Sequence, residues 1–99
     1  MIAVEQTQFT STNDRIADAL TIKSLGHPIR LKILVMLDMN TCNVKHLWEC
    51  LGMKQAAVSQ HLSVLKKCGI IDSNRKGAEL IYTIVNPLAQ KIVATLPRD

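Results

Sequence analysis

The chain has 99 residues and a mass of 11.0 kDa, which suffices for one small domain and excludes a two-lobed or barrel architecture. Hydrophobic residues make up 47% and charged residues 20%, with a mean hydropathy of +0.13, so the chain has enough apolar content to fold. No apolar run approaches the roughly 20 residues of a membrane span, and no signal peptide follows Met1, so we expect a cytoplasmic protein without membrane contact.

The net charge is +4, and its distribution along the chain is more informative than its total. Residues 1–18 hold three acids and one arginine, whereas residues 54–76 hold five basic residues and one acid. This local positive charge suggests a polyanionic partner, although a solvated lysine face would give the same pattern. Because only three aromatic residues occur, we exclude a site that reads bases by stacking.

Hydrophobic periodicity predicts a single domain over residues 13–99, after an N-terminal arm over residues 1–12 that shows no sustained period. The predicted helices cover residues 13–25, 28–37, 44–51, 54–68 and 87–96. Pro28 and Pro87 stand where proline can begin a helix, and His27 is expected to cap the helix that starts at Pro28. That second helix is apolar almost all round, which predicts a buried, central position.

The helix over residues 54–68 has two contrasting sides when it is drawn at 100° per residue. Val58, Leu62 and Leu65 form one narrow apolar seam, typical of a helix packed on a core. The opposite side is small, polar and basic. It consists of Ala56, Gln60, Ser63 and Lys67. It carries no acid, whereas a solvated helix face usually mixes Glu with Lys, and this absence favours contact with phosphate.

Beyond that helix the hydrophobic period changes to two. Residues 70–71 and 80–84 are β-branched, apolar or aromatic, and they bracket a polar turn at 73–78. The pattern predicts a β-hairpin whose tip presents Arg75 and Lys76. The predicted fold class is therefore mainly α with a small β-hairpin, in the order ααααββα.

A short helix, a glycine turn and a second helix with one apolar seam form the helix-turn-helix pattern of DNA-binding proteins, and the hairpin corresponds to a wing. The outward side of the second helix suits the major groove, because small residues let the backbone approach base edges. Gln60 can pair with an adenine edge, and Ser59 or Ser63 can reach a base or a phosphate. Arg75 and Lys76 can neutralise phosphate. The alternative interpretation of each of these residues is that it is an ordinary solvent-exposed side chain with no DNA contact.

Several segments between residues 16 and 96 carry a specific pattern. They are LGHPIRLKIL (25–34), LWECLG (47–52), QAAVSQHLSVL (55–65), GII (69–71) and the hairpin that ends in IY (81–82). Together they resemble the ArsR/SmtB family of bacterial winged helix-turn-helix repressors. The resemblance implies a homodimer through the first and last helices, which binds double-stranded DNA at an imperfect inverted-repeat operator and represses transcription.

The resemblance also implies which residues contact DNA, and the helical wheel adds two more. Residues of the helix over 54–68, which corresponds to the family's recognition helix, and of the wing are expected to reach bases and phosphates. Arg30 matches a position that contacts phosphate in the family. The complete expected set is Arg30, Gln55, Ala56, Ser59, Gln60, His61, Ser63, Lys67, Arg75 and Lys76.

Many members of that family sense metals, and this chain departs from their pattern. Metal-sensing members often carry Cys-x-Cys at the start of the third helix, where this chain has Asn43 and Lys45. Their last-helix sites use Asp, His and Glu, whereas residues 86–96 contain no His, Cys, Asp or Glu. Since a tetrahedral site needs thiolates or imidazoles at matched spacing, we predict no metal at either place and no cofactor.

The three cysteines, Cys42, Cys50 and Cys68, form no Cys-x-x-Cys pair, and their odd number argues against a disulfide framework. We interpret Cys50 and Cys68 as half-buried packing residues and Cys42 as an exposed thiol. Because the family includes dithiol sensors, a redox-responsive repressor that uses Cys42 with another cysteine remains an alternative. A disulfide needs Cα atoms within roughly 7 Å.

Two other classes of function were weighed against a DNA-binding repressor. One is a winged-helix module that binds a protein, with Ala56 and Ala57 in the contact patch and no operator. The other is an enzyme, which we exclude because no nucleophile, base and orienting group can be proposed and no phosphate-binding glycine loop is present. The leading prediction is a sequence-specific repressor that does not respond to metal at the usual family sites.

Overall fold

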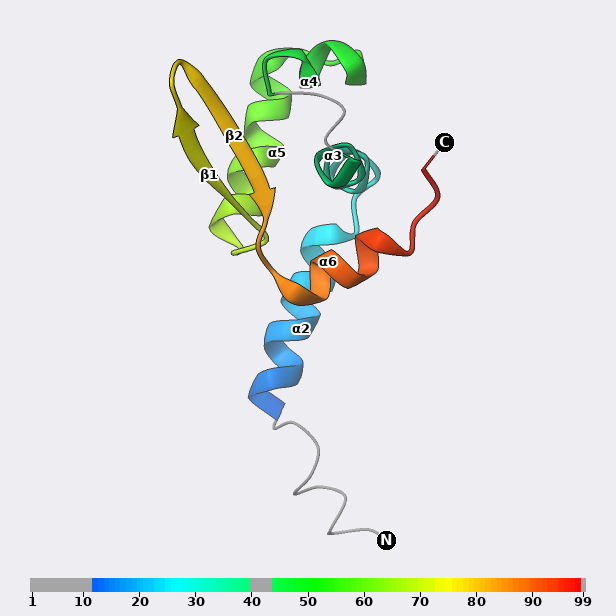
Figure 1. The fold of residues 1–99 in the computed structure, drawn as a ribbon. Helices are drawn as coiled ribbons and strands as arrows, with labels where there is room; N and C mark the ends of the chain where they lie inside the picture. Colours follow the sequence, from blue (N-terminus) through cyan, green and yellow to red (C-terminus); the bar gives the residue numbers. More distant parts are fainter. Residues whose placement is uncertain (1–11, 40–43, 99) are drawn as a thin grey trace, which may run out of the picture.

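The computed structural model describes residues 12–39 and 44–98, which form helices and one hairpin (Figure 1). The elements are α2 (Thr12–Leu25), α3 (Pro28–Met39), α4 (Val44–Leu51), α5 (Gln55–Lys67), β1 (Ile71–Lys76), β2 (Glu79–Ile84) and α6 (Pro87–Ala94). The predicted order ααααββα is confirmed. Residues 1–11 of the predicted arm lie outside the described residues. None of the helices in the described ranges is long and apolar enough to cross a membrane.

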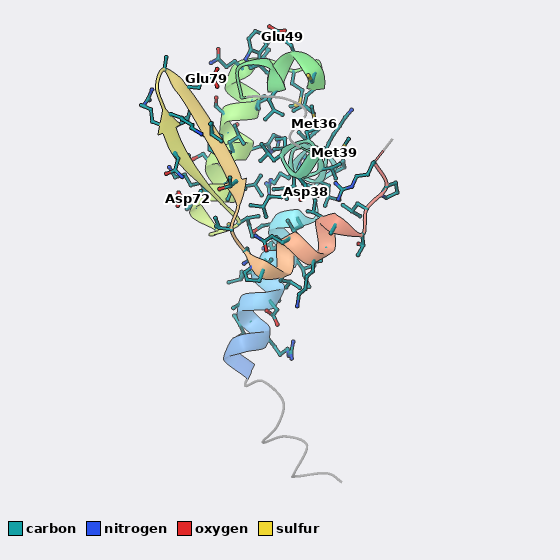
Figure 2. The ribbon with its side chains drawn as sticks, viewed as in Figure 1. Met36, Asp38, Met39, Glu49, Asp72 and Glu79 are labelled. Carbon is teal, nitrogen blue, oxygen red and sulfur yellow. The ribbon has the colours of Figure 1, made fainter. Side chains whose placement is uncertain are left out.

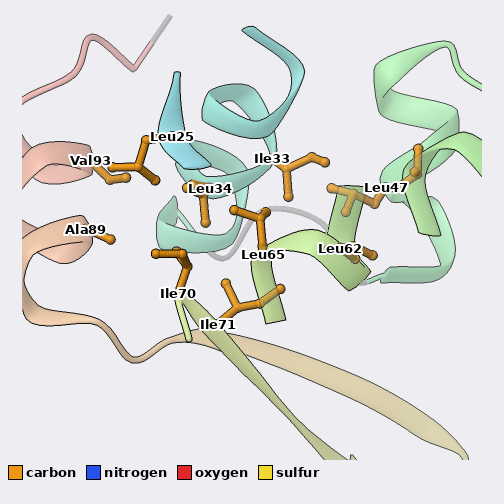
Figure 3. Packing of buried hydrophobic residues seen from close by; sticks show 11 residues of the cluster. Leu25, Ile33, Leu34, Leu47, Leu62, Leu65, Ile70, Ile71, Ala89 and Val93 are labelled. Carbon is orange, nitrogen blue, oxygen red and sulfur yellow. The ribbon is translucent and has the colours of Figure 1, made fainter. Parts of the chain in front are cut away.

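Helix α3 forms the centre of the core, as its apolar sequence predicts. Ile33 and Leu34 are fully buried, and α3 contacts α2, α5, α6 and β2. Figure 3 shows their side chains among those of the neighbouring elements. The other buried apolar residues around them are Leu25, Leu47, Val58, Leu62, Leu65, Ile70, Ile71, Ala89 and Val93. Burial of this cluster removes apolar surface from water and fixes α5 and the hairpin on one scaffold.

Side chains cap two of the helices where the sequence places capping signals. The backbone N–H of Ile29 donates to His27 Nδ1 at 3.1 Å, so the predicted cap of α3 is confirmed. Asn86 Oδ1 accepts from the N–H of Ala89 at 2.9 Å and so caps α6. The Asn86 amide also donates to Thr21 Oγ1 at 3.4 Å, which joins the start of α6 to the buried side of α2.

The hairpin is longer and its loop tighter than the sequence pattern predicts. The turn was expected over residues 73–78, but Asn74 pairs with Ile81 and Lys76 with Glu79, which leaves a two-residue loop at Gly77-Ala78. Gly77 has a φ of 65°, a conformation that costs little for glycine and permits the abrupt reversal. Polar residues 73–76 therefore lie in a strand, because backbone pairing with β2 outweighs their low strand propensity.

Two helix ends differ from the prediction by two residues, and three others differ by one. Helix α3 continues to Met39 rather than ending at residue 37, and α6 ends at Ala94 rather than 96. Arg98 donates to Asp38 Oδ2 at 2.6 Å, so the segment after α6 returns to the end of α3.

Candidate nucleic-acid interface

Helices α4 and α5 are joined by a short turn that the backbone itself fixes. Gly52 has a φ of 65°, and its N–H donates to the carbonyl of Glu49 at 3.1 Å. The carbonyl of Lys54 accepts from the N–H of Ala57 at 3.0 Å and begins α5. Leu47 on α4 is fully buried in the core. The arrangement is a helix-turn-helix, and it holds α5 with one side to the core and one side outward.

The two sides of α5 lie as its periodicity predicts. Val58, Leu62 and Leu65 are 2%, 4% and 0% exposed and anchor the helix. The opposite side, which we call the outer face of α5, is exposed. It consists of Ala56, Gln60, Ser63 and Lys67, and the exposed residues Gln55 and Ser59 lie between it and the seam. Because the helix is held from behind by its buried seam, this face can enter a groove without disturbing the core.

The hairpin lies alongside α5 and is fastened to the end of that helix (Figure 1). Lys66 Nζ donates to Ser73 Oγ on β1 at 2.7 Å, and the N–H of Ile70 donates to the carbonyl of Leu65 at 2.9 Å. Arg75 and Lys76 are exposed at the last two positions of β1. The wing cations are therefore held at a defined place beside the outer face of α5.

Two acids reduce the positive charge of the wing. Figure 2 shows Asp72 and Glu79 on the hairpin, and the strand register places Asp72 near its base and Glu79 opposite Lys76. The strands thus carry as many acids as bases. The positive charge counted over residues 54–76 therefore comes mainly from Lys54 and from the end of α5, where Lys66 and Lys67 are exposed.

Arg30 and His61 do not lie freely on the surface but contact each other. Arg30 Nε donates to His61 Nδ1 at 3.4 Å, and Arg30 Nη1 donates to the carbonyl of Ser24 at 3.2 Å. The rings of His27 and His61 have centroids 4.6 Å apart. Both Arg30 and His61 are half-buried. Burial lowers the pKa of His61, and the nearby charges of His27 and Arg30 lower that pKa further.

Most of the residues expected to contact DNA are thus exposed on α5 and the wing, two neighbouring elements, and Arg30 contacts α5 through His61. Two features were not predicted. The Lys66–Ser73 hydrogen bond depends on how the hairpin approaches α5, and the packing of His27 on His61 joins residues 34 positions apart. Neither has a local sequence signal.

The interpretation of the cysteines is wrong for two of the three. Cys50 and Cys68 are both exposed rather than half-buried, because the apolar seams of their helices point elsewhere. Cys42 lies outside the described residues, so its predicted exposure remains a prediction. Within residues 12–39 and 44–98 no three His, Cys, Asp or Glu side chains gather as metal ligands would.

Comparisons with known proteins agree on one family. The family model for bacterial regulatory proteins of the arsR family matches residues 27–73. The transcriptional regulator YgaV of Escherichia coli is 37% identical over 79 residues, which cover 79% of this chain and 80% of that protein. The transcriptional repressor PagR of Bacillus anthracis is 36% identical over 80 residues, which cover 80% of each chain.

Solved structures agree with these matches. The crystal structure of PagR superposes with a TM-score of 0.77 at 32% identity and covers 88% of this chain and 100% of that one. The homodimeric winged helix-turn-helix DNA-binding domain Mb0332 of Mycobacterium bovis superposes with a TM-score of 0.72 at 25% identity, over 87% of this chain and 82% of that one.

Proposed function

The chain belongs to the ArsR family of bacterial regulatory proteins, and we propose that it represses transcription by binding an imperfect inverted-repeat operator through α5 and the wing. It is a homodimeric DNA-binding transcriptional repressor with a winged helix-turn-helix fold, and it is not an enzyme. The family membership favours this function over a module that binds only proteins.

The outer face of α5 is the observation that carries the proposal. Its side chains are small, polar or basic and all are exposed, while the opposite seam is held in the core. In the proposed complex Gln60 reads a base edge, and Arg30, Lys67, Arg75 and Lys76 neutralise phosphates. The other contacts come from Gln55, Ala56, Ser59, His61 and Ser63.

The proposed dimer interface combines α2 and α6, which contact each other within one protomer. Helix α2 leaves three large apolar side chains exposed in one protomer. Burying them against a second protomer would remove apolar surface from water and so stabilise a dimer. They are Ile16 at 53%, Leu20 at 58% and Ile22 at 54%. We propose residues 13–99 as the unit that dimerises and binds DNA, and a cytoplasmic location where a bacterial repressor meets its operator.

We also propose that metal does not control this repressor at the usual family sites. The support is the absence of His, Cys, Asp and Glu from residues 86–96 and of a Cys-x-Cys pair at residues 43–45. A redox response remains an alternative, in which exposed Cys50 or Cys68 would act with Cys42.

Selection of bound sites from a random duplex pool tests the proposal directly. We expect a two-fold symmetric consensus whose half-sites lie about 10 bp apart, the spacing of successive major grooves on one face of DNA. The same selection with oxidant or with Zn²⁺ would leave that enrichment unchanged if neither redox nor metal controls binding. Failure to enrich any sequence would contradict operator binding.

A further inference from the structure

The contact between Arg30 and His61 links the start of α3 to the recognition helix at the margin of the proposed DNA surface. Arg30 has two partners, the imidazole Nδ1 of His61 and the carbonyl of Ser24, at 3.4 and 3.2 Å. A guanidinium has five N–H donors in one plane, so two of them can be held while others remain for a phosphate. Together these partners restrict the orientation of a long, flexible side chain before DNA arrives.

We propose that neutral His61 is a positioning residue that holds Arg30 for a DNA phosphate, and that protonation of His61 releases Arg30 and weakens operator binding at acid pH. The inference rests on the proposed function of Arg30 as a phosphate contact. It changes the role that the sequence analysis gave His61, from a direct DNA contact to a support for another residue.

The chemistry of imidazole sets the direction of the effect. Nδ1 accepts a hydrogen bond from Arg30 only while it is unprotonated, because imidazolium has N–H groups on both nitrogens and no acceptor. Protonation therefore removes the partner and places a positive charge beside the guanidinium. Since DNA binding uses the neutral form, binding expels a proton, and affinity falls as the pH falls through the range where His61 titrates.

The surroundings of His61 favour the neutral form at neutral pH. His27 and Arg30 are the titratable or charged groups in the described residues that act on it, and both oppose a positive charge there. His27 keeps its own task, because its Nδ1 accepts from the N–H of Ile29. Partial burial of His61 acts in the same direction.

The test measures the affinity of the full chain for a fluorescent duplex, recovered by selection, from about pH 8 to about pH 4.5. The range extends well below the ordinary histidine pKa, because the pKa of His61 is lowered. For the natural sequence we expect affinity to fall across this range by roughly three- to tenfold for each protomer that engages the duplex, the value of losing one modest hydrogen bond per protomer. His61→Leu, which has no acceptor, should bind weakly throughout and lose the pH dependence.

His61→Asn provides the rescue, because Asn Oδ1 occupies the position of Nδ1 and does not titrate in this range. It should recover most of the affinity lost in His61→Leu and hold it at acid pH. His27→Asn is the matched control, because it keeps an acceptor for the Ile29 amide and its affinity at about pH 8 should persist. Its loss of affinity at acid pH should also persist but begin at higher pH, because His27 no longer lowers the pKa of His61. His46, the third histidine of the sequence, is present in every variant and cancels in the comparison.

Two results would overturn the inference, and they differ from failure of the proposed function. Affinity that rises at acid pH and loses this rise in His61→Asn would mean that imidazolium contacts phosphate directly. A His61 NMR titration that is unchanged by Arg30→Met in the DNA-free protein would mean that the two side chains are not coupled. By contrast, an Arg30→Met variant with undiminished affinity, or no duplex binding at any pH, would contradict the proposed function itself.

Discussion

Gln60 and Lys76 are both exposed, but an amide and an ammonium group recognise DNA in different ways. A side-chain amide can pair with the N6 and N7 atoms of adenine and so distinguishes one base pair from another. An ammonium group at the end of β1 neutralises phosphate, which every sequence presents. The two residues therefore separate specificity from affinity in the proposed complex.

Replacing Gln60 by Ala should lower the discrimination between operator and scrambled duplex by about 1–3 kcal/mol. Lys76→Ala should instead weaken binding to both duplexes by similar factors. Competition titrations with the two duplexes measure both quantities. Lys32→Ala, which removes an exposed cation from α3 outside the proposed DNA contacts and dimer interface, controls for net charge and should change neither. If Gln60→Ala and Lys76→Ala both lose affinity uniformly, the assigned roles are wrong.

Leu65 lies in the apolar seam of α5, on the side that faces the core, and it is fully buried there. Its replacement by Ala leaves a cavity beneath the recognition helix, and we expect the free energy of unfolding to fall by about 2–5 kcal/mol. Urea denaturation followed by circular dichroism measures the loss. Ser59→Ala on the exposed face should stay within about 0.5 kcal/mol of the natural sequence. Equal losses in both variants would contradict the observed burial.

At the scale of the elements, periodic sequences and terminal signals were sufficient to predict the type and order of the helices and hairpin. The seam of α5 repeats clearly, Asn86 and Pro87 mark a helix start, and both regions form as expected. The hairpin strands could not be delimited, because residues 73–76 join β1 only through pairing with β2. Strand propensity is a property of each residue and its neighbours in sequence, so it does not include the hydrogen bonds that a partner strand supplies.

Helix α2 is the element whose sequence and surroundings agree least within one protomer. Two of its buried residues, Thr21 and Ser24, are polar, and Leu25 at its end is buried in the core, while Leu20 is apolar and 58% exposed. Burial of Leu20 against a second copy would resolve this inversion. A charged side chain at position 20 would then be buried away from water in the dimer, whereas in the isolated protomer it would remain solvated.

We therefore expect Leu20→Glu to shift the protein from dimer to monomer, with a helical circular dichroism spectrum like that of the natural sequence. Sedimentation velocity over a range of protein concentrations measures the shift. Ile81→Glu places the same charge at an exposed apolar residue of the wing and should leave the dimer intact. A dimer that persists in Leu20→Glu would exclude this part of α2 from the interface.

For the whole molecule, the exposed face of one helix could be predicted from the sequence, whereas contacts between distant segments could not. The outer face of α5 follows from the 100° rotation per residue, so its exposed residues could be chosen from the sequence. The contact of Arg30 with His61 spans 31 positions and depends on how α3 crosses α5. The charge of the wing was likewise overestimated, because Glu79 lies opposite Lys76 only once the strands pair.

The salt dependence of operator binding reports on the whole dimer, because the slope of log K against log salt depends on how many phosphates the dimer neutralises. Four cations per protomer are proposed phosphate contacts, namely Arg30, Lys67, Arg75 and Lys76, so a dimer makes about eight, and the slope of log K against log salt should be near −7. Lys76→Ala removes one contact from each protomer and should reduce the slope by roughly 2, whereas Gln60→Ala should leave it unchanged. Fluorescence anisotropy titrations at several salt concentrations give these slopes. A flat response would contradict phosphate neutralisation, and a slope of about half the expected value in the natural sequence would mean that one protomer engages the duplex alone.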